Sequence, residues 1–142
     1  MLLIDTSVWI NLFRDKSGVV RTKLQNYLEN RTYYLPIFTQ MELLQGCKDE
    51  TEWQKLSQYL AVQRYIIPDY STIWVEAARL YFELRRKGIT VRSNLDCAIA
   101  ICAIQDNLTL YHCDLAFGEA LRDRDFEQIA KVTTLKQKKL IF

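Results

Sequence analysis

Glycine, proline and histidine are scarce in this 142-residue chain, which has four glycines, two prolines and one histidine. So few glycines and prolines leave no room for a long flexible linker. The length fits one domain, residues 1–142, with a real hydrophobic core. The one histidine, His112, follows an apolar segment and is interpreted as structural. Because no GxSxG motif accompanies it, a serine–histidine triad is not indicated.

Zinc-binding and membrane-spanning patterns are also lacking. The four cysteines show no CxxC spacing, so no zinc site is predicted, and three lie in or beside apolar segments as reduced core residues. Asp5 interrupts the apolar N-terminal residues, which have no basic leader. The longest apolar run, 95–104, contains Asp96 and is about half as long as a membrane span. We therefore expect a cytoplasmic protein with no membrane segment; the net charge of +2 decides nothing.

Short apolar segments alternate with longer segments of helical periodicity. The expected strands are Leu2–Ile4, Tyr33–Pro36, 64–68, 108–113 and 131–135. One helix is expected directly after Asp5-Thr6-Ser7 and another after a cap at Thr39. The other expected helices are 19–30, 50–60, a long one from Trp74 that stops at Gly88, 95–108 and roughly 117–130. Lys136, Lys138 and Lys139 are interpreted as a solvated tail. This alternation predicts an α/β fold with a mainly parallel sheet of about five short strands, covered by helices on both faces.

Four acidic residues stand where reactive groups collect in such a sheet, near the carboxyl ends of the strands. Asp5 follows the first expected strand and Asp114 the fourth, while Glu42 and Asp96 lie early in helices. An unpaired carboxylate in the apolar run around Asp96 would be costly. Structural alternatives remain open: a helix cap for Asp5, the helix dipole for Glu42, an N-cap led by Ser93 or Asn94 for Asp96, and a turn for Asp114.

Several carboxylates in one pocket repel one another, so they must bind protons or recruit cations. Ligands that are all oxygen select a hard cation. The expected ion is Mg²⁺, with Mn²⁺ as a substitute.

The four acids stand in four short segments: IDTSVWI from Ile4, TQMELLQG from Thr39, NLDCAIA from Asn94 and LTLYHCD from Leu108. In this order and spacing the segments resemble the motifs of PIN-domain nucleases, particularly the VapC-type toxins of prokaryotic toxin–antitoxin pairs. The resemblance extends from Leu3 to about Leu135. It implies a three-layer α/β/α PIN-like domain.

The resemblance also implies an activity, namely a Mg²⁺-dependent endoribonuclease that acts as a toxin. Such proteins often cut transfer or ribosomal RNA, and in-line attack would leave a 5′-phosphate and a 3′-hydroxyl. Asp5, Asp96 and Asp114 would be metal ligands, and Glu42 would orient water or hold a second ion. Thr6 or Ser7 would hydrogen-bond a ligand carboxylate. The implied partners are RNA, a second copy of the chain, and a small antitoxin whose C-terminal segment fills the acidic groove.

One position departs from the family pattern, because Ala116 stands where a further acid is common. Asp123 and Asp125 are therefore rivals of Asp114 for the fourth acid.

Candidate RNA contacts are Arg14, Arg85, Arg86, Lys87 and Arg92, although three of them could simply favour a helix C-terminus. Two other functions stay open. One is an inactive RNA-binding or scaffold form of the same fold. The other is a receiver-type regulatory domain, which would need adjacent acids after the first strand.

Overall fold

The structure, a computed structural model, describes residues 1–113 and 120–140, and the side chains of all of these except 120–124. Within this part of the chain the strands are β1 (Leu2–Ile4), β2 (Tyr33–Pro36), β3 (Tyr65–Ile66), β4 (Thr109–Cys113) and β5 (Lys136–Leu140). The helices are α1 (Thr6–Arg14), α2 (Val19–Leu28), α3 (Phe38–Leu44), α4 (Glu50–Ala61), α5 (Ile73–Arg86), α6 (Asn94–Gln105) and α7 (Ala120–Val132).

The five strands form one parallel sheet in the order β3-β2-β1-β4-β5. From β1 the chain builds outward through β2 to β3, and it then returns to β4 on the other side of β1. The strand order therefore reverses between β1 and β4, where Ile4 pairs with Tyr111. In open parallel sheets, ligands bind beyond the carboxyl ends of the strands at such a reversal.

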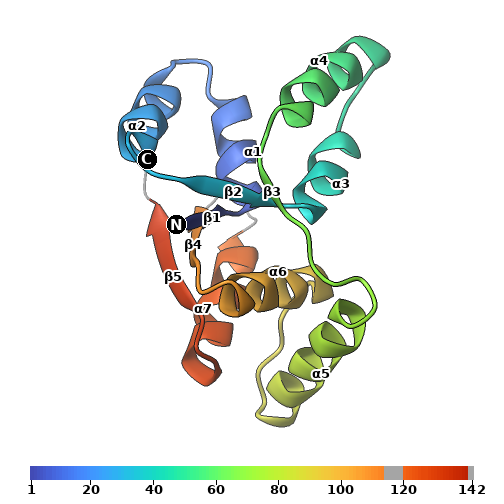
Figure 1. Cartoon of the computed structure of the whole chain (residues 1–142). Helices are drawn as coiled ribbons and strands as arrows, with labels where there is room; N and C mark the ends of the chain where they lie inside the picture. The colour runs from blue at the N-terminus through green and yellow to red at the C-terminus, as the bar shows by residue number, and fades with distance from the viewer. Residues whose placement is uncertain (114–119, 141–142) are drawn as a thin grey trace.

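Helices cover both faces of the sheet, which confirms the predicted three-layer fold (Figure 1). One core contains Leu3 of β1 together with apolar residues of α5, α6 and α7. The other contains Leu2 and Ile4 with residues of α1, α2 and α4. Because successive side chains of a strand point to opposite faces, the three-residue β1 contributes to both cores. α3 lies beside the sheet and contributes Phe38 to the first core and Leu43 to the second.

Polar caps set the beginnings of several helices. The carboxylate of Asp49 accepts a hydrogen bond from the Glu52 backbone N–H at the start of α4, and Ser93 caps α6 in the same way. Each cap satisfies a backbone donor that has no partner within the helix. α5 is followed by Gly88, whose φ of +76° suits glycine.

Three local predictions are wrong. Residues 131–135 are not a strand, because α7 continues to Val132 and the fifth strand follows at Lys136–Leu140. Lys136, Lys138 and Lys139 are therefore part of β5 rather than a solvated tail. β5 is an edge strand, and lysines are common there because they discourage pairing with a further strand. Thr39 does not cap α3, which begins at Phe38; it is buried within the helix.

The predicted interior is otherwise observed within the described residues. Cys97, Cys102 and Cys113 are buried and form no disulfide, while Cys47 is partly exposed. His112 is fully buried, and its Nε2 is hydrogen-bonded to the side chain of Gln137 in β5. None of the helices in this part of the chain combines the length and the apolar character needed to cross a membrane.

Candidate active site

Asp5 lies at the carboxyl end of β1 and begins α1. Its backbone N–H donates to the carbonyl of Tyr111 in β4 (2.8 Å), which fixes it at the reversal of strand order. Its Oδ2 accepts a hydrogen bond from the Ser7 backbone N–H (3.0 Å), so the capping interpretation holds. The carboxylate is nevertheless fully buried. Capping and a role in chemistry are therefore compatible at this residue.

Ser7 ties the end of β4 to the start of α1. Its Oγ accepts a hydrogen bond from the backbone N–H of Cys113, at 3.0 Å. Cys113 is the residue before Asp114, and Asp114 itself lies outside the described residues. The predicted fourth acid thus stays a prediction.

Glu42 is connected to the first motif by two hydroxyl groups. Thr6 Oγ1 donates to Glu42 Oε1 at 2.8 Å. The hydroxyls of Thr6 and Thr39 lie 3.0 Å apart. Because the single hydroxyl proton of Thr6 goes to Glu42, Thr39 donates to Thr6. The structure therefore contains a chain of hydrogen bonds, Thr39 to Thr6 to Glu42, that joins α3 to α1. Thr39 was missed as a site residue, although it precedes Glu42 by one helical turn.

Asp96 lies in the first turn of α6 and is fully buried. Ser93 is the N-cap, one of the two alternatives considered, and the positive end of the helix dipole favours a carboxylate at this place. The pKa of the neighbouring Cys97 thiol is raised to about 12, mainly by burial and to a smaller extent by the negative charges of Asp96 and Asp125.

Asp125 lies in α7 and is only 2% exposed. Its Oδ2 accepts a hydrogen bond from the backbone N–H of Arg92, at 2.8 Å. This bond anchors the loop that leads into α6 and therefore into Asp96. Asp125 thus has a positioning role in this structure, while the side chain of Asp123 lies outside the described residues.

The predicted ligand set is chemically suited to Mg²⁺, because every donor is a carboxylate oxygen. Among the side chains that the structure describes, however, no three from His, Cys, Asp or Glu form a group that could hold a metal ion. Of the predicted ligands, Asp5 and Asp96 are described and fully buried, and Asp114 is not described. The complete set is therefore not present in the described part of the chain.

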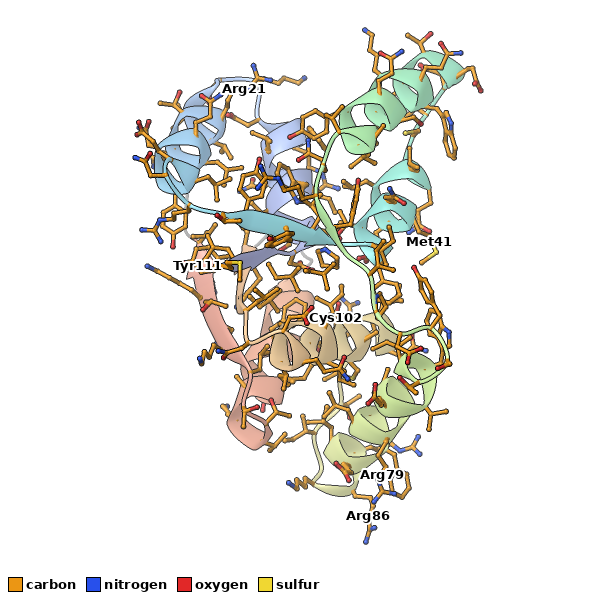
Figure 2. All side chains as sticks on the ribbon, viewed as in Figure 1. Arg21, Met41, Arg79, Arg86, Cys102 and Tyr111 are labelled. Atoms are coloured by element: carbon orange, nitrogen blue, oxygen red, sulfur yellow. The ribbon has the colours of Figure 1, made fainter. Side chains whose placement is uncertain are left out.

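The predicted RNA-contacting cations lie in different places. Arg14 ends α1 and shares a groove with Glu42. Arg85 and Arg86 lie over the rings of Tyr81 and Phe82 in their own helix. Figure 2 shows Arg86 at the far end of α5, well away from α1 and α3.

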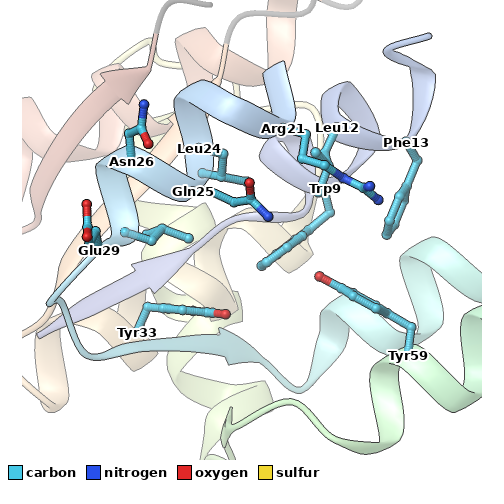
Figure 3. A pocket seen from close by; sticks show the side chains of 11 residues that line it. Trp9, Leu12, Phe13, Arg21, Leu24, Gln25, Asn26, Glu29, Tyr33 and Tyr59 are labelled. Carbon is cyan, nitrogen blue, oxygen red and sulfur yellow. The ribbon is translucent and has the colours of Figure 1, made fainter. Parts of the chain in front are cut away.

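An aromatic pocket of about 660 Å³ lies between α1, α2, β2 and α4. Figure 3 shows the rings of Trp9, Phe13, Tyr33 and Tyr59 around it. The Trp9 indole N–H is buried and has no acceptor within the described residues. Phe13 and Tyr59 are exposed, and exposed aromatic rings are typical of a surface that a partner covers.

An all-parallel sheet with a buried carboxylate at its strand reversal is typical of α/β proteins that bind their ligands at that reversal. The sequence profile of the PIN domain matches residues 2–132. Ribonuclease VapC11 of Mycobacterium tuberculosis is 30% identical over 138 residues, which cover 96% of each chain. The VapC ribonuclease Mb1587 of Mycobacterium bovis matches to the same extent. The chain therefore belongs to the PIN-domain family.

Solved structures support the fold. VapBC2 from Rickettsia felis, bound to a DNA fragment from its promoter, aligns with a TM-score of 0.70 and 21% identity over 99% of this chain and 100% of that chain. VapBC-1 from nontypeable Haemophilus influenzae aligns with a TM-score of 0.68 and 18% identity, over 97% of this chain and 96% of that chain. PIN-domain nucleases generally depend on divalent metal ions.

Proposed function

We propose that this protein is a Mg²⁺-dependent endoribonuclease and the toxin of a toxin–antitoxin pair. It hydrolyses phosphodiester bonds of RNA, with transfer or ribosomal RNA as the substrate, and leaves 5′-phosphate and 3′-hydroxyl ends. The observation that carries the proposal is the fully buried carboxylate of Asp5 at the reversal between β1 and β4. The relatives named VapC ribonuclease support it.

In this proposal Asp5, Asp96 and Asp114 hold the metal ion, and Mn²⁺ substitutes for Mg²⁺. The ion, when bound, lowers the pKa of a water molecule and offsets charge that builds up on the phosphate. Glu42 accepts the hydrogen bond of Thr6 and is thereby held facing the first motif, where it orients the attacking water. Asp125 keeps the loop before Asp96 in place.

The test compares Asp5→Asn and Asp96→Asn with Asp106→Asn, a matched change at the exposed C-cap of α6. We expect cleavage of RNA in Mg²⁺ to fall at least about 100-fold in the first two variants and to stay unchanged in the third. Mg²⁺ or Mn²⁺ should raise the melting temperature of the wild type and of Asp106→Asn only, because binding to the native state alone stabilises it. Undiminished cleavage in EDTA, or by Asp5→Asn, would contradict the proposal.

We also propose that a cognate antitoxin covers the aromatic pocket of Trp9, Phe13, Tyr33 and Tyr59. Related folds are seen in VapBC complexes, and the pocket offers the exposed rings of Phe13 and Tyr59 to a partner. Tyr33 lines this pocket and not the groove beside Glu42, so Tyr33→Ala should weaken neutralisation by the antitoxin without changing cleavage by the purified protein. Equal neutralisation of the wild type and Tyr33→Ala would exclude this pocket.

We further propose that the protein is cytoplasmic and forms a homodimer. The exposed side of α5 and the loop before it carries Tyr70 and Trp74, whose rings stack at 6.3 Å, beside Val75, which is 73% exposed. A contiguous apolar surface of this kind is typical of an interface between proteins. It lies on a different helix from those around the aromatic pocket, so both partners can bind at once.

A further inference from the structure

A second groove lies next to the candidate active site and is lined by cations. It has a volume of about 530 Å³ and runs between the end of α1, α3 and the start of α4. Arg14, Lys16 and Lys48 line it, and Glu42 of the candidate site lines it too. We call it the α1–α4 groove. Since Glu42 is hydrogen-bonded to Thr6 in the first motif, the groove meets the candidate site at Glu42.

The three cations are available to a ligand. Arg14, Lys16 and Lys48 are exposed, and within the described residues none of them forms an ion pair. Their acidic neighbours in sequence have other bonds. Asp15 accepts hydrogen bonds from the Ser17 and Val20 backbone N–H groups.

Glu52 lines the groove as well, but its carboxylate accepts the Lys48 backbone N–H at 2.7 Å. The carboxylates of Asp15 and Glu52 therefore hold the two turns that carry the lysines, and the ammonium groups remain available. Fixed turns are useful here because less conformational entropy is lost when a ligand binds.

An aromatic side chain adds a second kind of contact. Phe13 lines the same groove and is 47% exposed. It lies edge-on to Tyr59, with the ring centroids 5.7 Å apart, which restrains it. Cations that follow a groove, together with an exposed ring on which a base can stack, are the usual features of surfaces that bind single-stranded nucleic acid.

We propose that the α1–α4 groove holds a single-stranded segment of the RNA substrate next to the scissile bond. In this arrangement Lys16 and Lys48, together with Arg14, contact successive phosphates, and Phe13 stacks on a base. The inference rests on the proposed ribonuclease activity and adds the path of the RNA to it. Lys16 and Lys48 are positioning residues that contact the substrate away from the reacting phosphate.

The first experiment measures binding separately from cleavage. Anisotropy of a labelled single-stranded RNA of mixed sequence is followed in EDTA between about 0.05 and 0.5 M salt. Lys16→Gln/Lys48→Gln is compared with Lys23→Gln/Lys131→Gln, which removes the same charge from exposed positions on α2 and α7. Each lost phosphate contact lowers the slope of log K against log salt by about 0.7, so the groove variant should lose about 1.4. With equal binding of the two proteins at 1 M salt, this difference in slope makes binding by the groove variant about 25-fold weaker at 0.1 M salt. The control should bind as the wild type does.

The second experiment uses Cys47, which lines the groove and is the one cysteine that is not buried. RNA should slow its alkylation by iodoacetamide several-fold. Burial raises the pKa of this thiol, with smaller contributions from Glu52 and Asp49, so the reaction is run at about pH 8.5. The control is Lys23→Cys in a Cys47→Ser background, whose thiol RNA should not protect.

The outcomes separate this inference from the proposed function. If the wild type cleaves RNA in Mg²⁺ but the groove variant and the control bind RNA equally well, the proposed RNA path is wrong and the proposed nuclease activity is supported. Loss of antitoxin affinity in the groove variant, with RNA binding intact, would assign the groove to the antitoxin and also overturn it. Lysine-dependent binding and protection of Cys47 in a protein that cleaves no RNA would support the path and reject the nuclease.

Discussion

The hydrogen-bond chain from Thr39 through Thr6 to Glu42 allows a quantitative test with Thr6→Val, which keeps the shape of the side chain and removes its hydroxyl. Thr6 is fully buried and donates to Glu42 at 2.8 Å. A hydrogen bond to a charged acceptor contributes about 1.5–3 kcal/mol to stability, and the buried Thr39 hydroxyl that loses its acceptor adds about 1–3 kcal/mol. Glu42 is only partly buried, which reduces the first figure. We expect a total loss of about 2–3 kcal/mol in the free energy of unfolding.

The assay is equilibrium unfolding in urea, with Thr22→Val as the matched control. Thr22 makes its hydroxyl hydrogen bond to Gly18 on the exposed surface of α2, so its variant should lose less than about 0.5 kcal/mol. Thr39→Val leaves the bond from Thr6 to Glu42 in place and should lose about 1 kcal/mol.

In Thr6→Val/Thr39→Val no threonine hydroxyl is left buried without a partner. The double variant should therefore be at least about 1 kcal/mol more stable than the sum of the single losses predicts. Because Glu42 loses its anchor, kcat for RNA cleavage should fall more than KM rises. Additive losses, or a Thr6→Val protein within about 0.5 kcal/mol of the wild type, would refute the proposed chain.

Three further predictions concern other parts of the molecule. Asp125→Asn can still accept the hydrogen bond from the Arg92 N–H, so this variant should keep its cleavage activity. Asp125→Ala cannot, and its free energy of unfolding should be about 1–3 kcal/mol lower. An inactive Asp125→Asn would instead make this residue a metal ligand. The pKa values of Cys97 and Cys102 are raised to about 12 mainly by burial, so the folded protein retains protons that the unfolded chain releases above about pH 9. Its melting temperature should fall from pH 9 to 12, and a flat profile would contradict this. Trp74→Glu should shift light-scattering mass from dimer to monomer, and an unchanged mass would exclude the α5 surface.

The sequence was most informative where local pattern and burial agree. The apolar run of α6 with Asp96 inside it, and the short run of β1 before Asp5, predicted buried elements with acids at their ends. Strand order was not needed for this, because all parallel strands end at the same edge of the sheet.

Elements whose side chains mostly face solvent were harder to predict. β5 contains three lysines in five residues, and its exposure alternates along the strand. That composition indicates a charged tail, but these residues form a strand because they are hydrogen-bonded to β4. Thr39 was predicted to be a cap from its residue type, but its hydroxyl contacts a residue 33 positions earlier. Such long-range contacts depend on the tertiary fold and leave no local signal.

The central position of β1 also has a consequence for biosynthesis. Residues 2–4 are translated well before residues 109–111, which are one of their two neighbours in the sheet. At about 5–20 residues per second, ribosomes need roughly 5–20 s to make the intervening chain. Throughout that interval the nascent polypeptide cannot form the β1–β4 pairing that fixes Asp5, so the candidate active site is completed late in synthesis.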